Sequence, residues 1–527
     1  MAPTSSRSWD EVPTEIRLLI LEDLLDSGCK LAPLATVSRE WQRVIERRVF
    51  ARIKLTPYCL ADFATNIHRN RALLHYIWFC VELGEYDCRQ CDAHFETLSY
   101  VDANLIARAI RDLFWTLHTW EPNGELLLDI SSDSKHWFNY LTFRPDVPSS
   151  ECGWSTGIEQ ALPENIDDDE HDWTDDSEIV RVRIASAITN NLASIDFSSS
   201  VFHGQRKESE WWGTLPYVPA ITGLILRQQT RRQWSPFSLQ HMFEHLSGLK
   251  EIYLEPWKQV FEDVTSYRDK SYVSLLGRLI SGKLQKIVIF QNYNRYYLPF
   301  SDALDSTTSD SDTFDTDTSD AYISDADTPD SAPNMIRTLS RAAAASSLKL
   351  ESFSVSFLVD AQYFFSASKA SWKWPKMTSL ILTSRLLGPD TPRTDIDGVL
   401  ISAAATALNM PKLKSMEIWN GEAQLASLFK YQPSGGQMYA SITWKSTWWF
   451  TLRPPVIRAW EAVANKYGGR KLTINMEILD VDPFTDIKSH GDAIHYLKLS
   501  QPVVRPVSLQ QIRTEHNIHH MWEERKR

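Results

Sequence analysis

The clearest metal-binding spacing in the chain is Cys88-Arg-Gln-Cys91, which is followed by His94. Cysteine and histidine at this spacing are ligands of structural zinc, but a closed zinc site needs four ligands, usually supplied as two such pairs. Cys80 is the only other cysteine nearby, and the chain has no second Cys-x-x-Cys pair. We therefore predict no metal site and no bound cofactor.

The residues that could perform catalysis do not form an enzyme motif. The chain has no Walker loop, no Gly-rich dinucleotide turn, no nucleophile elbow and no HExxH sequence. Its densest carboxylates are nine acids in residues 164–178 and ten aspartates in residues 301–330. Residues 301–332 consist almost wholly of Ser, Thr, Asp and Ala, a composition that predicts a disordered acidic insert. Such carboxylates hold no fixed geometry, so we predict a non-catalytic protein with no catalytic residue.

The charge of the chain is unevenly distributed. The two acidic segments contain no Lys or Arg, and removing their 19 charges from the net charge of −12 leaves +7 on the remaining residues. Nucleic-acid binding proteins usually show a clustered basic face, which this weak excess does not predict. The most apolar run, residues 73–83, is too short to span a membrane, and no signal peptide opens the chain. We expect a cytoplasmic or nuclear protein, or one in both compartments, that binds neither nucleic acid nor membrane.

Tryptophan beside arginine is the composition of a protein-binding hot spot. The best such cluster lies in LILRQQTRRQW and contains Arg227, Arg231, Arg232 and Trp234, which we take as candidate target-binding residues. The same composition is also typical of a loop that is packed by its tryptophan and solvated by its arginines. Both interpretations stay open at this stage.

Helices and strands must position the candidate residues, and the stretch from Val12 to Phe50 is the most informative about such elements. A first helix is predicted from Pro13 to about Asp26, with a proline at its start and Gly28 after its end. Two further helices are predicted, over residues 31–37 and 39–49. The first helix has two apolar faces and only a narrow polar strip, so a unit of this size cannot bury all of its apolar surface. The surplus predicts a partner, or docking onto the rest of the chain.

The order of residues in this stretch resembles the F-box, the helical module that attaches substrate receptors to the Skp adaptor of Skp–cullin–F-box ubiquitin ligases. The matching positions are Pro13, Glu15, Ile16, Leu19, Leu24, Leu34, Val37, Ser38, Arg39 and Trp41. Two positions depart from the usual pattern: Val12 stands where leucine is usual, and Gly28-Cys29-Lys30 replaces a common Asp-Pro turn. Such variants resemble those of filamentous-fungal F-box proteins. The later segments ARIKLTPYCLADF and ITWKSTWWF also resemble that fungal family. The resemblance implies binding to the Skp adaptor, and through it to cullin, by Pro13, Ile16, Leu19, Ile20, Leu24, Leu34, Val37 and Trp41.

A repeated pattern begins after about the first third of the chain. The template L-x-x-L-x-L, with any large apolar residue allowed, begins at Leu192, Ile221, Leu249, Leu284, Leu350, Met377, Leu413 and Tyr439. The spacing is 26 to 36 residues, apart from one gap of 66 residues that contains the acidic insert. Predicted helices over residues 238–246, 272–280, 335–345 and 399–408 precede several of these strands. Helix, stop and strand at this interval are typical of leucine-rich repeats, although an ordinary α/β domain also contains such triplets.

The predicted fold is α/β: an N-terminal three-helix F-box followed by an irregular leucine-rich-repeat-like α/β solenoid. We divide the chain into an F-box (8–52), a mixed linker region (53–185), a repeat body (186–450) and a C-terminal capping region (451–527). The linker is predicted to contain helices over 66–83 and 103–117 and a strand over 126–130, and the capping region a helix that starts at Pro454.

The predicted function is substrate recognition within a Skp–cullin–F-box ubiquitin ligase, which recruits an unidentified protein target and acts by proximity rather than by chemistry. The alternative is a non-catalytic repeat scaffold that acts independently of ubiquitination, with N-terminal helices docked internally. A hydrolase on an α/β fold is a third class, but it lacks any supporting motif.

Overall fold

A computed structural model of the chain describes residues 9, 12–26, 31–83, 100–133, 194–195, 197–228, 233–258, 262–279, 283–294, 332–434, 439–467, 469 and 471–526. Several predictions lie outside these residues. They are the zinc-like triplet of Cys88, Cys91 and His94, the acidic loop at 164–178, nearly all of the acidic insert, and Arg231 with Arg232.

One twelve-stranded sheet organises the described part of the chain, and the order of its strands in space follows their order in the sequence. Every neighbouring pair of strands is parallel, except that β12 is antiparallel to both β11 and β13. The strands are β1 (Arg52–Leu55), β2 (Tyr76–Glu82), β3 (Leu127–Asp133), β5 (Gly223–Leu226), β7 (Glu251–Leu254), β8 (Lys286–Phe290), β9 (Ser352–Ser356), β10 (Ser379–Thr383), β11 (Ser415–Glu422), β12 (Leu425–Pro433), β13 (Tyr439–Ser446) and β14 (Lys471–Ile478). Two short strands, β4 (Ser194–Ile195) and β6 (Gln233–Trp234), form a separate parallel pair.

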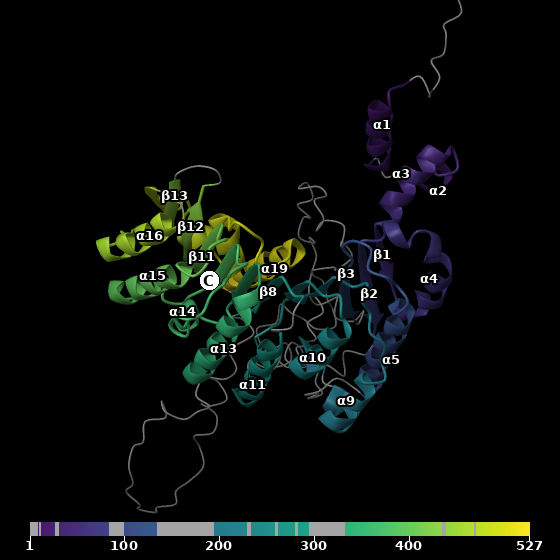
Figure 1. Cartoon of the computed structure of the whole chain (residues 1–527), viewed down its shortest axis with the longest axis horizontal. Coiled ribbons are helices and arrows are strands. Elements are labelled where there is room, and N and C mark those ends of the chain that lie inside the picture. The colour runs from purple at the N-terminus through teal and green to yellow at the C-terminus, as the bar shows by residue number, and fades with distance from the viewer. Residues whose placement is uncertain are drawn as a thin grey trace, which may run out of the picture.

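A layer of helices covers one face of this sheet (Figure 1). Its members are α4 (Leu60–Asn66), α5 (Tyr100–Leu117), α8 (Phe197–Ser200), α9 (Gln205–Trp212), α10 (Pro236–His245), α11 (Glu262–Arg278), α13 (Ala332–Ser346), α14 (Ala361–Ser366), α15 (Arg393–Ala407) and α16 (Pro454–Lys466). Short 3-10 turns lie at Pro57–Cys59, Ile67–Arg69, Arg71–Leu73 and Ser347–Lys349. Because side chains alternate along a strand, every second strand residue, such as Ile252, Ile287 and Leu380, is buried against apolar helix residues such as Leu276 and Leu400.

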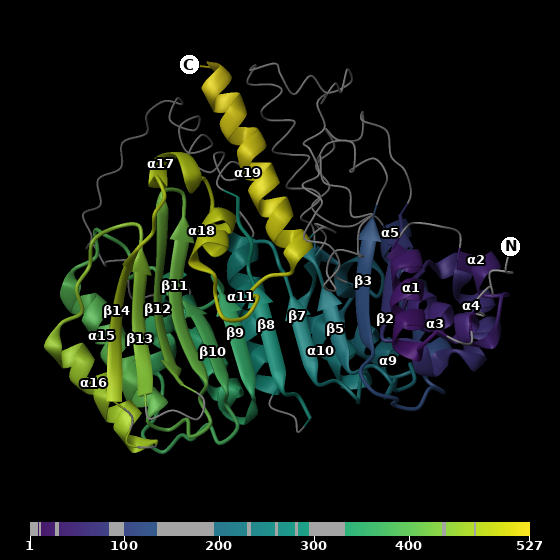
Figure 2. The ribbon, with the colours of Figure 1, turned by 90° about the horizontal axis from the view of Figure 1, so that it is seen from above.

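The C-terminal segment, residues 479–526, lies on the opposite face, which we call the inner face. It contains α17 (Pro483–Asp486), α18 (His490–Leu497) and α19 (Pro506–Lys526), and Figure 2 shows α19 starting near the ends of β7 and β8 and extending beyond the strands. Inner-face residues Phe290, Ile381 and Trp419 form a second core with Ile494 of α18 and Ile512 of α19. The segment therefore runs back over the sheet, whereas the sequence predicted only a terminal cap.

The predicted repeat strands starting at 221, 249, 284, 350, 377, 413 and 439 are confirmed, and so are the strand at 126–130 and the helix from Pro454. The helix predicted over 66–83 is wrong, because these residues form 3-10 turns followed by β2. Six of the seven residues of β2 are buried, and its sequence is apolar without interruption from Tyr76 to Val81, so it carries no strand period. The strand predicted at Leu192 joins the small β4–β6 pair and not the main sheet.

Candidate protein-interaction sites

The N-terminal helices are joined directly to the sheet. They are α1 (Thr14–Asp26), α2 (Leu31–Leu34) and α3 (Arg39–Phe50), and α3 is followed at once by β1. The carbonyl of Ala51 accepts hydrogen bonds from the backbone N–H groups of His75 (3.0 Å) and Tyr76 (3.1 Å) at the start of β2. The side chain of Ser38 caps α3 by accepting from the N–H of Trp41. The end of α3 is thus fixed to the first two strands.

Packing between α1 and α3 buries only a few apolar side chains. Leu21 of α1 and Ile45 of α3 are buried, and an ion pair of 3.4 Å joins Arg17 to Glu40. The Trp41 ring lies 5.5 Å from the ring of Trp9. The remaining apolar face of α1 has no comparable cover among the described residues.

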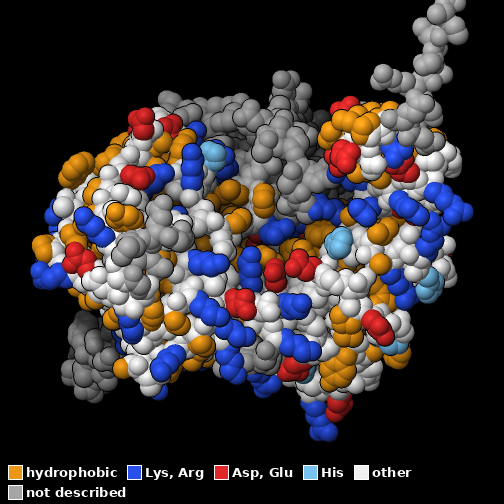
Figure 3. Space-filling view, turned by 45° about the horizontal axis from the view of Figure 1, so that its top comes forward, with side chains coloured by type: hydrophobic (Ala, Val, Ile, Leu, Met, Phe, Trp, Pro, Cys, Tyr) orange, Lys and Arg blue, Asp and Glu red, His pale blue; other side chains and the backbone are white. Residues whose placement is uncertain are grey.

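We call Pro13, Ile16, Leu19, Ile20 and Val37 the N-terminal apolar surface. The four larger side chains are 46%, 59%, 39% and 60% exposed, and Pro13 is exposed as well. Ile16, Leu19 and Ile20 share one face of α1, because residues three and four apart are neighbours on a helix. Figure 3 shows hydrophobic side chains gathered over this part of the molecule, at the upper right. An exposed apolar stripe such as the one on α1 is typical of an interaction site.

The other predicted adaptor-binding residues are less accessible. Leu24, Leu34 and Trp41 are half-buried, so they support the helical unit as well as bordering its surface. Leu18 and Val49, which were not predicted, are exposed instead, at 38% and 45%.

The candidate target-binding cluster does not provide an exposed arginine–tryptophan pair. Trp234 is buried, and its ring packs edge-on against that of Phe197 at 5.7 Å. Arg227 is only 10% exposed and pairs with Asp129, whose side chain is 1% exposed. The expectation that these residues face a partner is therefore wrong for both. Trp234 packs inside the fold, and Arg227 is paired with the opposite charge that a buried charge requires.

Asp129 lies at the centre of a hydrogen-bonded network that joins three neighbouring strands. The Arg227 Nε donates to Asp129 Oδ2 at 2.6 Å, and a second guanidinium nitrogen donates to the Tyr76 hydroxyl at 2.5 Å. The Tyr76 hydroxyl in turn donates to Asp129. Arg227, which was predicted to bind a target, therefore links the end of β5 to β2 and β3 across the inner face.

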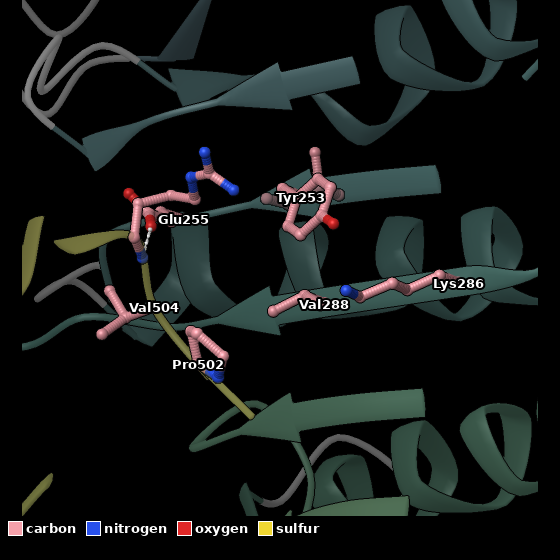
Figure 4. Close-up of a pocket in the computed structure, with 8 residues that line it drawn as sticks. Tyr253, Glu255, Lys286, Val288, Pro502 and Val504 are labelled. Atoms are coloured by element: carbon pink, nitrogen blue, oxygen red, sulfur yellow. Dashed lines mark hydrogen bonds between the residues drawn. The ribbon is translucent and has the colours of Figure 1, made fainter. Parts of the chain in front are cut away.

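A small cavity lies further along the inner face, where the C-terminal segment crosses β7 and β8 (Figure 4). Its volume is about 70 Å³, enough for a small side chain or a few water molecules. The lining residues are Tyr253, Leu254, Glu255, Lys286, Val288, Pro502, Val504 and Arg505. Lys286 Nζ lies 5.2 Å from the centre of the Tyr253 ring, as does the guanidinium carbon of Arg505.

The polar groups around this cavity serve the fold. Glu255 accepts from the backbone N–H of Arg505 at 2.7 Å and from the hydroxyl of Ser508, and so caps the start of α19. The Tyr253 hydroxyl donates to Glu251 at 2.6 Å. Burial, followed by this hydrogen bond, raises the pKa of Tyr253 well above its usual value, so the phenol stays protonated at neutral pH.

The buried histidine of α18 is also held neutral. Burial, followed by the nearby His516, lowers the pKa of His490 well below its usual value. Its Nε2 lies 2.8 Å from Asn292 Oδ1, and its ring is 5.5 Å from that of His516. Among the described residues, no group of three or more His, Cys, Asp or Glu side chains is arranged to hold a metal ion. Across the same residues, we find no helix that is long and apolar enough to span a membrane.

Comparison with protein families gives one match. Residues 280–505 are similar to a family of unknown function, DUF6546. The matched stretch runs from just before β8 to the residue that precedes α19, and it leaves out the N-terminal helices and the first strands. Neither the comparison with curated proteins nor that with solved structures found a match.

Proposed function

We propose that the chain is the substrate-recognition subunit of a Skp–cullin–F-box ubiquitin ligase of the fungal kind. The observation that carries the proposal is the N-terminal apolar surface, which lies within the stretch that resembles the F-box. Three of its side chains, Ile16, Leu19 and Ile20, form an exposed stripe on α1, while Leu21 is buried on another face of the helix. Burial of such side chains contributes about 1.5–3 kcal/mol each, which is the usual driving force of association.

The attachment of these helices suits a device that positions one protein relative to another. The α3 helix continues into β1, and Arg69 Nη2 lies 3.3 Å from a carboxylate oxygen of Glu46 on α3. A ligase of this class works by holding a target lysine near a ubiquitin-loaded enzyme, which raises its effective concentration. A rigid link between the adaptor-binding helices and the body preserves that geometry.

We further propose that the body is an irregular leucine-rich-repeat-like solenoid. The order of the strands in space follows the chain from β1 to β14, and helices on one face alternate with most of the strands. A single strand and helix cannot bury their apolar faces alone, so stacked units share one continuous core. The antiparallel β12 departs from a regular repeat.

Co-expression with a Skp adaptor tests the proposal. The double variant Leu19→Asp, Val37→Asp places two charges on the N-terminal apolar surface and should weaken adaptor binding at least about 100-fold. The matched control is Val101→Asp, Phe484→Asp, because these side chains are 74% and 70% exposed and belong to α5 and α17 rather than to α1–α3. The control should bind normally, and both variants should melt at the wild-type temperature.

Adaptor binding that survives the Leu19→Asp, Val37→Asp change would contradict the assignment. A chain that is soluble and monodisperse alone, and that does not bind the adaptor, would instead support the alternative of an interaction scaffold independent of ubiquitination.

A further inference from the structure

The last strand of the sheet is long and open to solvent. β14 spans eight residues, all of which are exposed except Leu472, which is partly buried. It pairs with β13 along one edge only and is the last strand of the order that begins with β1, and Figure 2 shows it at one end of the sheet. Proteins usually protect such an edge with charges, proline, a bulge or a covering loop, because its free backbone groups accept another strand.

The backbone of β14 shows which residues are free to pair. The N–H of Leu479 donates to the carbonyl of Ser446 on β13 at 2.9 Å. Because successive residues point their backbone groups to alternate edges, the odd-numbered residues of β14 face β13. Leu472, Ile474, Met476 and Ile478 therefore direct their N–H and C=O groups outward.

The side chains of the same even-numbered residues form an apolar row. Ile474, Met476 and Ile478 are 43%, 39% and 47% exposed, and they lie on the face that the helices cover elsewhere. The odd-numbered residues, Lys471, Thr473, Asn475 and Glu477, are polar and lie on the inner face. The only two charged residues of β14, Lys471 and Glu477, lie near its opposite ends and have opposite signs.

We propose that β14 pairs with β14 of a second copy of this chain, antiparallel and across a two-fold axis at Ile474. This register places Lys471 of each copy opposite Glu477 of the other, so two pairs of opposite charges form. It also places Leu472 opposite Met476 and Ile474 opposite itself, and opposite-charge and apolar cross-strand pairs stabilise a sheet. The outward backbone groups of these three residues then exchange hydrogen bonds with their counterparts.

The neighbouring registers lack this match. Centring the axis on Asn475 places Glu477 opposite Thr473, and centring it on Thr473 places Lys471 opposite Asn475. Both keep the outward backbone groups aligned but separate the charges. The pairing at Ile474 joins the sheets of two copies into one and is isologous, which is the commonest form of dimer. It uses a surface remote in sequence from residues 12–50 and does not depend on the proposed adaptor binding.

Sedimentation of the full-length chain over a range of concentrations tests the dimer. The wild-type chain should approach twice its 60.6 kDa mass as the concentration rises. Ile474→Lys places a charge in the apolar row and should raise the dissociation constant at least about tenfold. Ile401→Lys is the matched control, because Ile401 is a 37% exposed isoleucine on α15, and it should dimerise as the wild type does.

Charge reversal tests the register. Lys471→Glu and Glu477→Lys each place like charges opposite one another twice, so each alone should weaken the dimer. The double variant restores both pairs and should recover it. Lys445 lies beside Glu477 in the β13–β14 register, so the melting temperature of each variant is measured to separate a folding defect from a pairing defect.

The dimer proposal is wrong if the wild-type chain keeps its monomer mass of 60.6 kDa when its concentration is about 100 times that of the adaptor-binding assay. A dimer that is insensitive to Ile474→Lys also overturns it, as does a double charge reversal that stays as weak as the single ones. Binding of an extended peptide to β14 by a monomeric chain would assign the edge to another partner and reject the second copy.

Discussion

The inner face of the sheet is stabilised in different ways in its two halves. Between β2 and β5, polar side chains of the sheet bond one another, as Tyr76, Asp129 and Arg227 do. Between β7 and β12, some of them also bond the C-terminal segment. Glu255 caps α19, and Glu417 of β11 accepts from the N–H of Ser500 at 3.0 Å and pairs with Lys430 at 3.4 Å.

This difference in bonding indicates which part of the molecule can open without loss of the fold. The network of Asp129 joins three adjacent strands, so breaking it weakens the sheet itself. The contacts of Glu255 and Glu417 join the sheet to a segment that packs on its surface. Under that segment, the hydroxyls of Ser354, Ser356 and Ser379 are buried without a hydrogen bond among the described residues, which costs stability there. We therefore expect the C-terminal segment to separate from the sheet before the sheet unfolds.

The largest effect should come from Arg227→Ala. It leaves the carboxylate of Asp129 buried and unpaired, and breaking a buried ion pair in this way costs about 3–5 kcal/mol. Chemical denaturation should show this loss in the global free energy of unfolding. A change below about 1 kcal/mol would show that the first half of the sheet does not depend on the network.

The next effect should come from Glu255→Ala. Arg505 and Ser508 lose their acceptor at the start of α19, at a cost of about 1–3 kcal/mol. We expect faster hydrogen exchange in residues 506–516, with unchanged protection in β3. Equal loss of protection in β3 would show that the two halves are not independent.

Acidification should act on the second half of the inner face through the buried His490. Because the pKa of His490 is lowered in the folded chain, the unfolded state binds a proton first as the pH falls below about 6.5, and it is stabilised relative to the folded state. Protection of α18 should therefore be constant above that pH and decrease below it, by at most about 1.4 kcal/mol per pH unit. His490→Gln should remove most of this dependence, and a profile that is unchanged in the variant would refute its assignment to His490.

The smallest effect should come from Arg206→Ala, which serves as the control for Arg227→Ala. Arg206 pairs with Glu210 on α9 at 3.0 Å, but the two side chains are 91% and 63% exposed. Exposed pairs at this helical spacing contribute about 0.3–0.5 kcal/mol. Denaturation should hardly distinguish this variant from the wild type, and a large loss would show that exposure is not what separates the two arginines.

Much of the sheet could be predicted from the sequence, because the L-x-x-L-x-L pattern recurs after predicted helices at a nearly regular interval. Seven strands from β5 to β13 were found in this way. β14 was missed although KLTINMEI alternates strictly between polar and apolar residues, so the signal was present. β2 carries no such signal, because it is buried on both faces.

The candidate sites depended on information that one sequence does not contain. The exposed stripe on α1 could be predicted, since its apolar residues exceed what α3 can cover. The pairing of Arg227 could not, because Asp129 lies 98 residues earlier in the chain. The position of α18 and α19 on the inner face was equally hidden, because an apolar helix face does not state which surface it covers.

The order of the strands has a consequence for biosynthesis. Each strand of the sheet lies beside the one made before it, so the sheet can extend at its newest edge as the chain leaves the ribosome, where folding begins from the N-terminus. Residues 479–526 are made after all twelve strands. Nevertheless, Ser508 of α19 donates a hydrogen bond to Glu255, which lies 253 residues earlier in the chain. The inner face between β7 and β12 therefore stays open from the time its strands are made until residues 479–526 follow, and a chaperone or partner that binds there would meet it before the last segment closes it.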